Sequence, residues 1–432
     1  MPNTSKKSSK KKVYQAPRGM HDVLPEMQPW WDKVYREFKE IAEFYGFGKI
    51  DTPILEDAEI FIRGSGATTD IVQKEMYILR TRGGDHLALR PESTPGICRA
   101  YTENAMFNWP QPVKLFYFNS IFRHDKPQAG RYRQFYQFGL ETLGEESAIV
   151  DAEIIQVTWM FLNELGIKNS HIELNNIGCS SCRPAYRNAI KSYYRPKVKK
   201  LCSECKRRLK ENPLRLLDCK NEECKALRVG LPPTVDRLCD DCKKHFETLL
   251  EYLDELNIPY NLNQNLVRGL DYYTRTVFEI WLENDDGSLA LGGGGRYDDL
   301  IHLLGGPKKP AVGVALGVER IINILKEKGG RPSQCYKPKA YLVQLGEMAK
   351  KKSFKILEDF RKNNITIASS LGRDNLRAQL KNADRLQVQY ALIFGQKEVI
   401  DETVILRDMQ SGLQEIIPLS KIVVEIKKRL KS

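Results

Sequence analysis

The sequence predicts an α+β domain that is interrupted by a cysteine-rich insertion and followed by a small α/β domain. Two aromatic-rich runs, Val113 to Phe122 and Arg133 to Leu143, flank a polar loop and predict a long β-hairpin. Eight of the ten cysteines lie between Cys179 and Cys242, where the chain also becomes basic. Near the C-terminus, β-like runs alternate with helical periodicity, which is typical of a small α/β domain with a mixed sheet.

The elements of the first domain follow from periodicity and from glycine stops. Trp31, Val34, Phe38 and Ile41 recur at intervals of three and four, so a helix is predicted up to Gly46. The other predicted elements are helices at 151–165 and 316–328 and strands at 261–268, 276–282 and 311–315. Because strands resume after the cysteine-rich stretch, the first domain is predicted to be completed there.

In the last domain the predicted strands are 340–345, 365–370 and 390–395, and the predicted helices are 349–362 and 374–386. Changes of composition then divide the 432 residues into six segments. They are a disordered basic tail (1–12), the first domain in two parts (13–170 and 259–328), a cysteine-rich insertion (171–258), a linker (329–336) and the last domain (337–432).

The net charge of +13 is unevenly distributed. The tail, residues 171–230 and residues 335–432 are basic, and the remainder is net negative. This pattern suits a polyanion that is bound at the edges of the molecule, although solvation of exposed faces is the alternative. No apolar run approaches the roughly 18 residues of a membrane helix, and the N-terminus lacks the apolar core of a signal peptide. We therefore expect a soluble, cytoplasmic protein without a membrane partner.

The clustered cysteines form four pairs, three of which have the two-residue gap that zinc sites favour. A reducing compartment makes disulfides the weaker interpretation. Two tetrahedral Cys₄ zinc sites are the hypothesis, and free structural thiols are the alternative. The sequence leaves open which pairs combine. The candidate ligands are Cys179, Cys182, Cys202, Cys205, Cys219, Cys224, Cys239 and Cys242.

The second strand of the hairpin has two different faces, because alternate residues of a strand point to the same side. One face is apolar and can pack on a core. The other presents Arg133, Phe135, Gln137, Gly139 and Glu141, which together could form the floor of a pocket for a polar ligand. A solvated face of an antiparallel sheet is the alternative interpretation.

Several ordered motifs resemble those of histidyl-tRNA synthetases. Phe122 to Phe135 resembles motif 2 of that family, Leu266 to Tyr273 and Leu291 to Asp298 resemble its two histidine-specific motifs, and Gly313 to Arg320 is similar to motif 3 of class II synthetases. Arg18 to Pro25 resembles the opening of the family. The resemblance covers residues 14–430 in consistent order, and chance is a poor explanation for so many motifs.

The resemblance implies a class II synthetase-like antiparallel sheet with helices in the first, catalytic domain and an anticodon-binding last domain. It also implies a homodimer and a two-step reaction. In the first step, the histidine carboxylate attacks the α-phosphorus of ATP, which is supplied with Mg²⁺, and pyrophosphate leaves. In the second step, the terminal ribose hydroxyl of tRNA(His) takes the acyl group.

The same resemblance implies the site residues. Arg268 and Arg123 would be catalytic, because cations must stabilise the charge that accumulates on the α-phosphate. The histidine-binding residues would be Glu92, Ser93, Thr94, Arg123, Gln137, Glu141, Arg268, Tyr272 and Tyr273. The ATP-binding residues would be Arg123, Arg131, Phe135 and Arg320, with Phe135 stacked on adenine. Glu141 and Tyr273 would recognise the imidazole, which can donate from one nitrogen and accept at the other.

Two other functions compete with this interpretation. The first is a non-catalytic paralogue, like the regulatory subunit of the histidine-pathway phosphoribosyltransferase, which lacks the anticodon domain and parts of the substrate motifs. This chain has sequences that resemble both the anticodon domain and the substrate motifs. The second is a zinc-dependent nucleic-acid-binding protein without enzymatic activity, which would bind neither ATP nor histidine.

Overall fold

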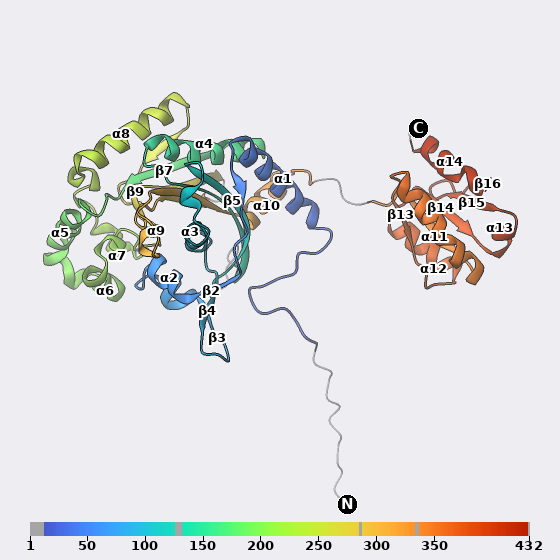
Figure 1. The fold of residues 1–432 in the computed structure, drawn as a ribbon, viewed down its shortest axis with the longest axis horizontal. Helices are drawn as coiled ribbons and strands as arrows, with labels where there is room; N and C mark the ends of the chain where they lie inside the picture. Colours follow the sequence, from blue (N-terminus) through green and yellow to red (C-terminus); the bar gives the residue numbers. More distant parts are fainter. Residues whose placement is uncertain (1–12, 126–131, 285–286, 333–336, 431–432) are drawn as a thin grey trace, which may run out of the picture. The chain divides into compact units, whose positions relative to one another are not determined.

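A computed structural model describes residues 13–125, 132–284, 287–332 and 337–430. The predicted tail at 1–12, part of the linker and Arg131 therefore lie outside the described residues. The chain forms two units, residues 1–333 and 334–432. Figure 1 shows the large sheet of the first unit and the smaller sheet of the second.

The first unit is built on an eight-stranded sheet with the order β1-β5-β6-β11-β10-β9-β7-β8. Neighbouring strands are antiparallel except for the outermost pairs, β1 with β5 and β7 with β8, which are parallel. The predicted hairpin is confirmed, because β5 and β6 pair from Val113 with Leu143 to Phe122 with Gln134. The strands are β1 Gly48–Lys49, β5 Val113–Phe122, β6 Gln134–Leu143, β7 Ser170–Asn176, β8 Tyr260–Leu262, β9 Thr274–Asn284, β10 Gly287–Arg296 and β11 Ala311–Gly317.

Helices cover one face of this sheet and enclose the main core (Figure 1). The first of them buries Trp31, Val34, Phe38 and Ile41, the four residues whose spacing predicts it. Because this periodicity places apolar side chains on one side of the helix, that side packs against the sheet. The helices are α1 Gln28–Phe44, α4 Ala148–Glu164, α8 Asp240–Glu255 and α10 Val318–Glu327.

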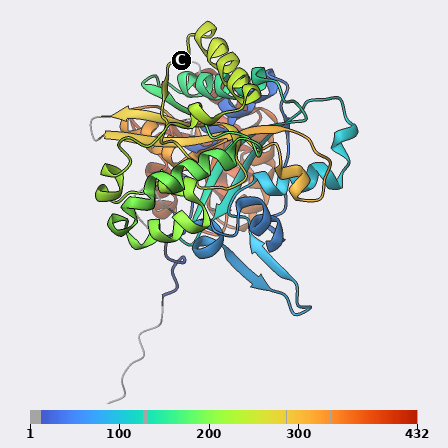
Figure 2. The same ribbon diagram turned by 90° about the vertical axis from the view of Figure 1, so that its left-hand side faces the viewer.

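The other face of the sheet packs against α3 and a second apolar cluster that includes Ile97, Tyr101 and Tyr117. A small three-stranded sheet, β2-β4-β3, lies on this side, and its β3–β4 hairpin projects from the unit (Figure 2). The sequence pattern did not predict this small sheet. Its strands are β2 Leu55–Asp57, β3 Tyr77–Arg80 and β4 His86–Leu89, and the helices on this side are α2 Ala58–Ser65, α3 Thr94–Glu103 and α9 Leu300–Leu303.

The cysteine-rich insertion is helical. Its predicted bounds, 171–258, include β7 and α8, which belong to the large sheet and to the main core. The strand predicted at 261–268 is wrong beyond Leu262, because Asn263 accepts the backbone N–H groups of Asn265 and Leu266 and closes a turn. The helices between β7 and α8 are α5 Arg183–Tyr194, η3 Arg195–Lys200, α6 Ser203–Glu211, η4 Pro213–Leu216, α7 Glu222–Ala226 and η5 Thr234–Arg237.

The second unit has a five-stranded mixed sheet with the order β13-β12-β14-β15-β16. The predicted alternation of strands and helices is confirmed over β12, β13 and β14, which are parallel. The antiparallel strands β15 and β16 complete the sheet and were not predicted. The elements are β12 Ala340–Gln344, α11 Glu347–Lys362, β13 Ile367–Ser369, α12 Leu376–Arg385, β14 Tyr390–Phe394, α13 Gln396–Ile400, β15 Thr403–Asp408, β16 Gln414–Pro418 and α14 Ile422–Arg429.

Candidate active site

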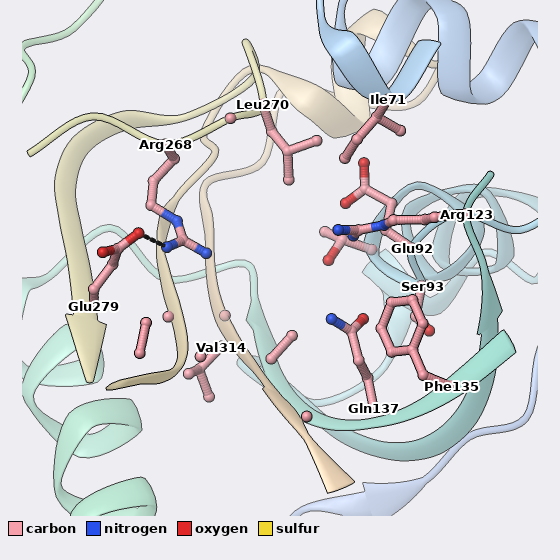
Figure 3. A pocket seen from close by; sticks show the side chains of 18 of the residues that line it. Ile71, Glu92, Ser93, Arg123, Phe135, Gln137, Arg268, Leu270, Glu279 and Val314 are labelled. Carbon is pink, nitrogen blue, oxygen red and sulfur yellow. Dashed lines mark hydrogen bonds and ion pairs between the residues drawn. The ribbon is translucent and has the colours of Figure 1, made fainter. Parts of the chain in front are cut away.

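A cavity of about 430 Å³ opens beside α3, over the strands β6, β10 and β11 (Figure 3). Most of the predicted site residues line it, although they come from positions as distant as 92 and 320 in the chain. Glu141 lies directly behind the cavity wall. The predicted residues that line the cavity are Glu92, Ser93, Thr94, Arg123, Phe135, Gln137, Arg268, Tyr272, Tyr273 and Arg320.

Arg123 and Arg268 point into the cavity from opposite sides (Figure 3). The Nε of Arg123 donates a hydrogen bond of 2.8 Å to the carbonyl oxygen of Pro91, and its guanidinium lies 5.6 Å from the centre of the Phe135 ring. Arg268 forms an ion pair with Glu279 on β9. An anionic group between the two guanidinium groups would thus be approached from both sides by fixed positive charge.

Arg268 remains cationic despite its position in the wall. Burial alone would lower the pKa of Arg268, but Tyr273 and Glu279 raise it above its ordinary value. The glycine-rich strand β10 leaves room for this side chain, because a Cβ at Gly293 would lie 2.7 Å from Nη1 of Arg268. The glycines 292–295 therefore lie in strand β10, against which the guanidinium of Arg268 packs.

Glu92 is 5% exposed and is held by two hydroxyl groups. Ser65 donates to Oε1, and the hydroxyl of Tyr272 donates to Oε2 at 2.6 Å. Burial raises the pKa of Glu92, and these two donors oppose the shift. A bound cation such as a substrate ammonium would stabilise the ionised carboxylate here.

Glu141 on β6 is 1% exposed. Its Oε1 accepts a hydrogen bond of 2.7 Å from Thr94, and its Oε2 accepts one from the hydroxyl of Tyr297. Burial raises the pKa of Glu141 to about 8, against the effect of both donors. The carboxyl is therefore largely protonated near neutral pH in the free protein, and a ligand that carries a cation or a hydrogen-bond donor would favour its ionised form.

The remaining predicted residues take different positions in the wall. Ser93 is buried and accepts a hydrogen bond of 3.1 Å from Asn119. Tyr273 lies with its ring 5.9 Å from the Arg268 guanidinium, and Arg320 donates a hydrogen bond of 2.5 Å to the carbonyl oxygen of Ala290 on β10. Gln137 lies on the cavity floor with its amide directed inward (Figure 3).

Other residues that line the cavity were not among the predicted site residues, and they include Tyr117, Arg215, Glu279 and Tyr297. Tyr297 lies in the second histidine-specific motif, so the sequence could have indicated it as a site residue. Tyr117 and Glu279 occupy strands whose alternation allowed either face, and Arg215 belongs to the insertion. Only the folded chain brings Arg215 to the cavity.

Comparisons with known proteins agree with this geometry. The sequence model of the family described as "Histidyl-tRNA synthetase" matches residues 19–321, and that described as "Anticodon binding domain" matches residues 339–429. The histidine–tRNA ligase of Dehalococcoides mccartyi (strain ATCC BAA-2266 / KCTC 15142 / 195) is 48% identical over 418 residues, which cover 97% of this chain and 100% of the relative. The chain belongs to the histidyl-tRNA synthetase family. It is therefore an aminoacyl-tRNA ligase, of the family that activates histidine and charges tRNA with it.

Solved structures also show the histidyl-tRNA synthetase fold. The apo histidyl-tRNA synthetase of S. aureus has a TM-score of 0.78 and 33% identity, over 96% of this chain and 100% of that one. A Bacillus halodurans protein described as "an ATP phosphoribosyltransferase regulatory subunit/histidyl-tRNA synthetase" has a TM-score of 0.64 at 21% identity, over 89% of this chain and 99% of that one, and shows the fold alone. The matched anticodon-binding domain separates the chain from the paralogue considered above.

The eight clustered cysteines form two separate groups. The first group combines Cys179 and Cys182 with Cys239 and Cys242, and the second combines Cys202, Cys205, Cys219 and Cys224. Within each group all sulfur atoms lie within 4.8 Å of one another. The outer pairs of the sequence therefore combine with each other, as do the inner pairs, which the spacing alone left open.

In the part of the chain that the structure describes, no helix is both long and apolar enough to cross a bilayer.

Proposed function

We propose that the described cavity is where histidine is activated on ATP, and that the residues lining it have the roles that the family resemblance implies. The observation that supports this most is the opposition of Arg123 and Arg268 across the cavity. In this proposal Arg123 binds the α-phosphate, and Arg268 stabilises the charge that develops there from the other side. Arg320 binds the terminal phosphates of ATP, which arrives with Mg²⁺ as its counter-ion.

Histidine would be recognised at the end of the cavity that is opposite the proposed site for the terminal phosphates of ATP. Its ammonium would bind to Glu92, with Thr94 and Gln137 as further acceptors, and Ser93 and Tyr272 would complete the wall around it. Its imidazole would lie between Glu141 and Tyr273, which offer an acceptor and a hydroxyl. Phe135 would stack on adenine beside Arg123, whose guanidinium already lies against the ring. Arg131, also proposed for ATP, lies outside the described residues.

A histidine-specific pyrophosphate exchange assay tests this proposal. The purified protein is expected to exchange pyrophosphate into ATP with histidine and with none of the other amino acids. A buried site that hydrogen-bonds an imidazole rejects ligands without those groups by about 10⁴-fold. Exchange with another amino acid, or with none, would contradict the assignment of the cavity.

We also propose tRNA(His) as the macromolecular substrate and the cytoplasm as the compartment. The match of residues 339–429 to an anticodon-binding domain and the basic charge of residues 335–432 support the first. The phosphate backbone of RNA favours basic surfaces, so binding should weaken as the salt concentration rises. The compartment follows from the role of the family in translation.

A homodimer is a further proposal, supported by an apolar face of the small sheet β2-β4-β3. Opposite one another on this face are Leu55, Leu89 and Tyr77, and the next row has Leu87 and Leu79 beside Asp57 at the end of β2. Leu55 is 42% exposed and Leu79 is 45% exposed. A contiguous exposed apolar patch of this kind favours association with a second copy. Sedimentation of the wild type as a dimer, and of Leu79→Lys as a monomer, would support this face as the interface.

Two structural zinc ions are proposed for the cysteine groups. A tetrahedral zinc ion with Zn–S bonds of about 2.3 Å holds its sulfur atoms about 3.8 Å apart. Three sulfur–sulfur distances fit this geometry: 3.7 Å for Cys179–Cys182, 3.8 Å for Cys182–Cys242 and 3.9 Å for Cys202–Cys219. Burial raises the pKa of Cys242, and coordination to a divalent cation would favour its thiolate form. The ions would stabilise the fold of the insertion.

A further inference from the structure

The insertion contacts the loop that forms one side of the cavity. Arg215, on η4 between the cysteines of the second group, is 6% exposed and lines the cavity. Its Nη1 donates a hydrogen bond of 3.2 Å to the carbonyl oxygen of Thr68, and its Nη2 lies 3.5 Å from Oδ2 of Asp70. The loop around Thr68 is thus held by a side chain of the insertion.

A second contact joins the insertion to the first histidine-specific motif. The Nδ2 of Asn212 donates a hydrogen bond of 2.8 Å to Oδ1 of Asp271. The other oxygen of the same carboxylate accepts one of 3.2 Å from the hydroxyl of Thr68. The backbone N–H of Asp271 donates to the carbonyl oxygen of Ser65 at 3.0 Å. Asp271 therefore ties together the insertion and both loops of the cavity.

The two tied loops both hold Glu92. Ser65, at the end of α2, and Tyr272, next to Asp271, are the two donors to its carboxylate. The packing between Gly66 and Asp271 is tight. Gly66 has a φ of 98°, and a Cβ there would lie 2.5 Å from Oδ2 of Asp271. A displacement of Asp271 would therefore move a donor of Glu92.

We propose that Asn212 and Arg215 of the insertion are positioning residues of the amino-acid site. They fix Asp271 and Thr68, and these fix Tyr272 and Ser65, which aim Glu92 at the ammonium of histidine. This inference rests on the proposed role of Glu92. It makes the insertion a part of the machinery that binds histidine, in addition to any contact that it makes with tRNA. The guanidinium of Arg215 is suited to this role because it reaches two acceptors at once, which a lysine cannot reproduce.

Histidine affinity and pyrophosphate exchange in the full-length protein test the proposal. Asn212→Ala and Arg215→Lys are each expected to raise the KM for histidine at least fivefold, while the KM for ATP stays within twofold. Asn212→Asp should have a larger effect than Asn212→Ala, because it places a second carboxylate against Asp271. Lys210→Ala, at an exposed position of α6, is the matched control and should behave as the wild type.

A double substitution distinguishes positioning from general damage. Asn212→Asp combined with Asp271→Asn exchanges donor and acceptor across the same pair, and it should recover histidine affinity to within about threefold of the wild type. The melting temperature and the metal content of each variant should match those of Lys210→Ala. A fall in kcat without a change in the KM for histidine would overturn the proposal, as would an unchanged KM in Arg215→Lys and Asn212→Asp.

Glu92→Gln separates this inference from the proposed function. If Glu92 binds the ammonium, this substitution raises the KM for histidine at least tenfold, whatever the insertion variants do. If it leaves that KM unchanged, the proposed role of Glu92 is wrong. If Glu92→Gln has its effect and the insertion variants do not, only the positioning role of Asn212 and Arg215 is wrong.

Discussion

Thr94, the first residue of α3, donates a hydrogen bond of 2.7 Å to Glu141 on strand β6. The carboxylate also accepts a hydrogen bond from Tyr297, so both of its oxygens are engaged within the protein. This arrangement fixes the carboxyl in one orientation. The proposed histidine site is thus partly organised before a ligand binds, and the burial of the carboxyl lowers the stability of the folded chain.

Glu141→Gln is expected to stabilise the protein at alkaline pH while it weakens histidine binding. The pKa of Glu141 is raised from 4.5 to about 8, so between these values the folded state binds more protons than the unfolded state. Stability from this group therefore falls as the pH rises through that window. The difference in melting temperature between Glu141→Gln and the wild type should be smallest near pH 4.5 and should grow up to about pH 8. A constant difference would contradict the role of burial.

Above pH 8, where Glu141 is ionised, the same variant should bind histidine at least about tenfold more weakly than the wild type, because a hydrogen bond to a charged acceptor contributes about 1.5–3 kcal/mol. Isothermal titration calorimetry measures this directly. Glu145→Gln is a suitable control, since Glu145 follows β6 outside the cavity. Equal affinity in the wild type and in Glu141→Gln would remove this residue from the recognition of imidazole.

Arg268→Ala is expected to lower the rate of adenylate formation far more than it lowers histidine affinity. Removal of one preorganised donor from a developing oxyanion costs about 10²–10³-fold in kcat. Arg268→Lys should lose most of that activity as well, because an ammonium cannot reproduce bidentate contact with phosphate. Pyrophosphate exchange gives kcat, and calorimetry gives histidine affinity. A loss of less than tenfold in Arg268→Ala would show that its assigned role is wrong.

Gly293→Ala is expected to act through Arg268. The added Cβ would lie 2.4 Å from the carbonyl oxygen of Phe278 and 2.7 Å from Nη1 of Arg268, so the strand or the arginine must move. Overpacking of this kind costs about 1–3 kcal/mol of stability. We expect a loss of kcat in pyrophosphate exchange of at least tenfold. Gly48→Ala, whose Cβ would meet nothing closer than 3.9 Å, is the control in the same sheet and should retain full activity.

The sequence predicted those parts of the site that depend on local pattern. Alternation along β6 places Phe135, Gln137 and Glu141 on one face, because the period of a strand is two. The opposite face is buried in the main core, as expected from Phe138 and Leu140. Local periodicity could not predict the pairing of Glu141 with Gly313 in β11, because that register depends on contacts between segments that are distant in the chain.

The features that the sequence did not predict depend mostly on contacts between segments that are distant in the chain. Arg215 reaches the cavity only because η4 packs beside the Thr68 loop, and a basic residue in an insertion gives no signal of such a position. The cysteine spacing predicted two metal sites but not their membership, since four pairs can combine in three ways. The strand expected beyond Leu262 was wrong because Asn263 uses its own oxygens to close a turn, a local choice that competed with β-propensity.

Two zinc ions per chain are expected from the two cysteine groups, and each should depend on its own ligands. Cys179→Ser and Cys219→Ser should each retain about one zinc ion, because the sulfur atoms of one group are shared only within that group. Cys98→Ser is the matched control, since Cys98 is buried outside both groups, and it should retain two. Mass spectrometry of the native protein or elemental analysis gives the stoichiometry. Loss of both ions from either single variant would show that the groups are not independent, and well under one zinc ion in the wild type would leave them as structural thiols.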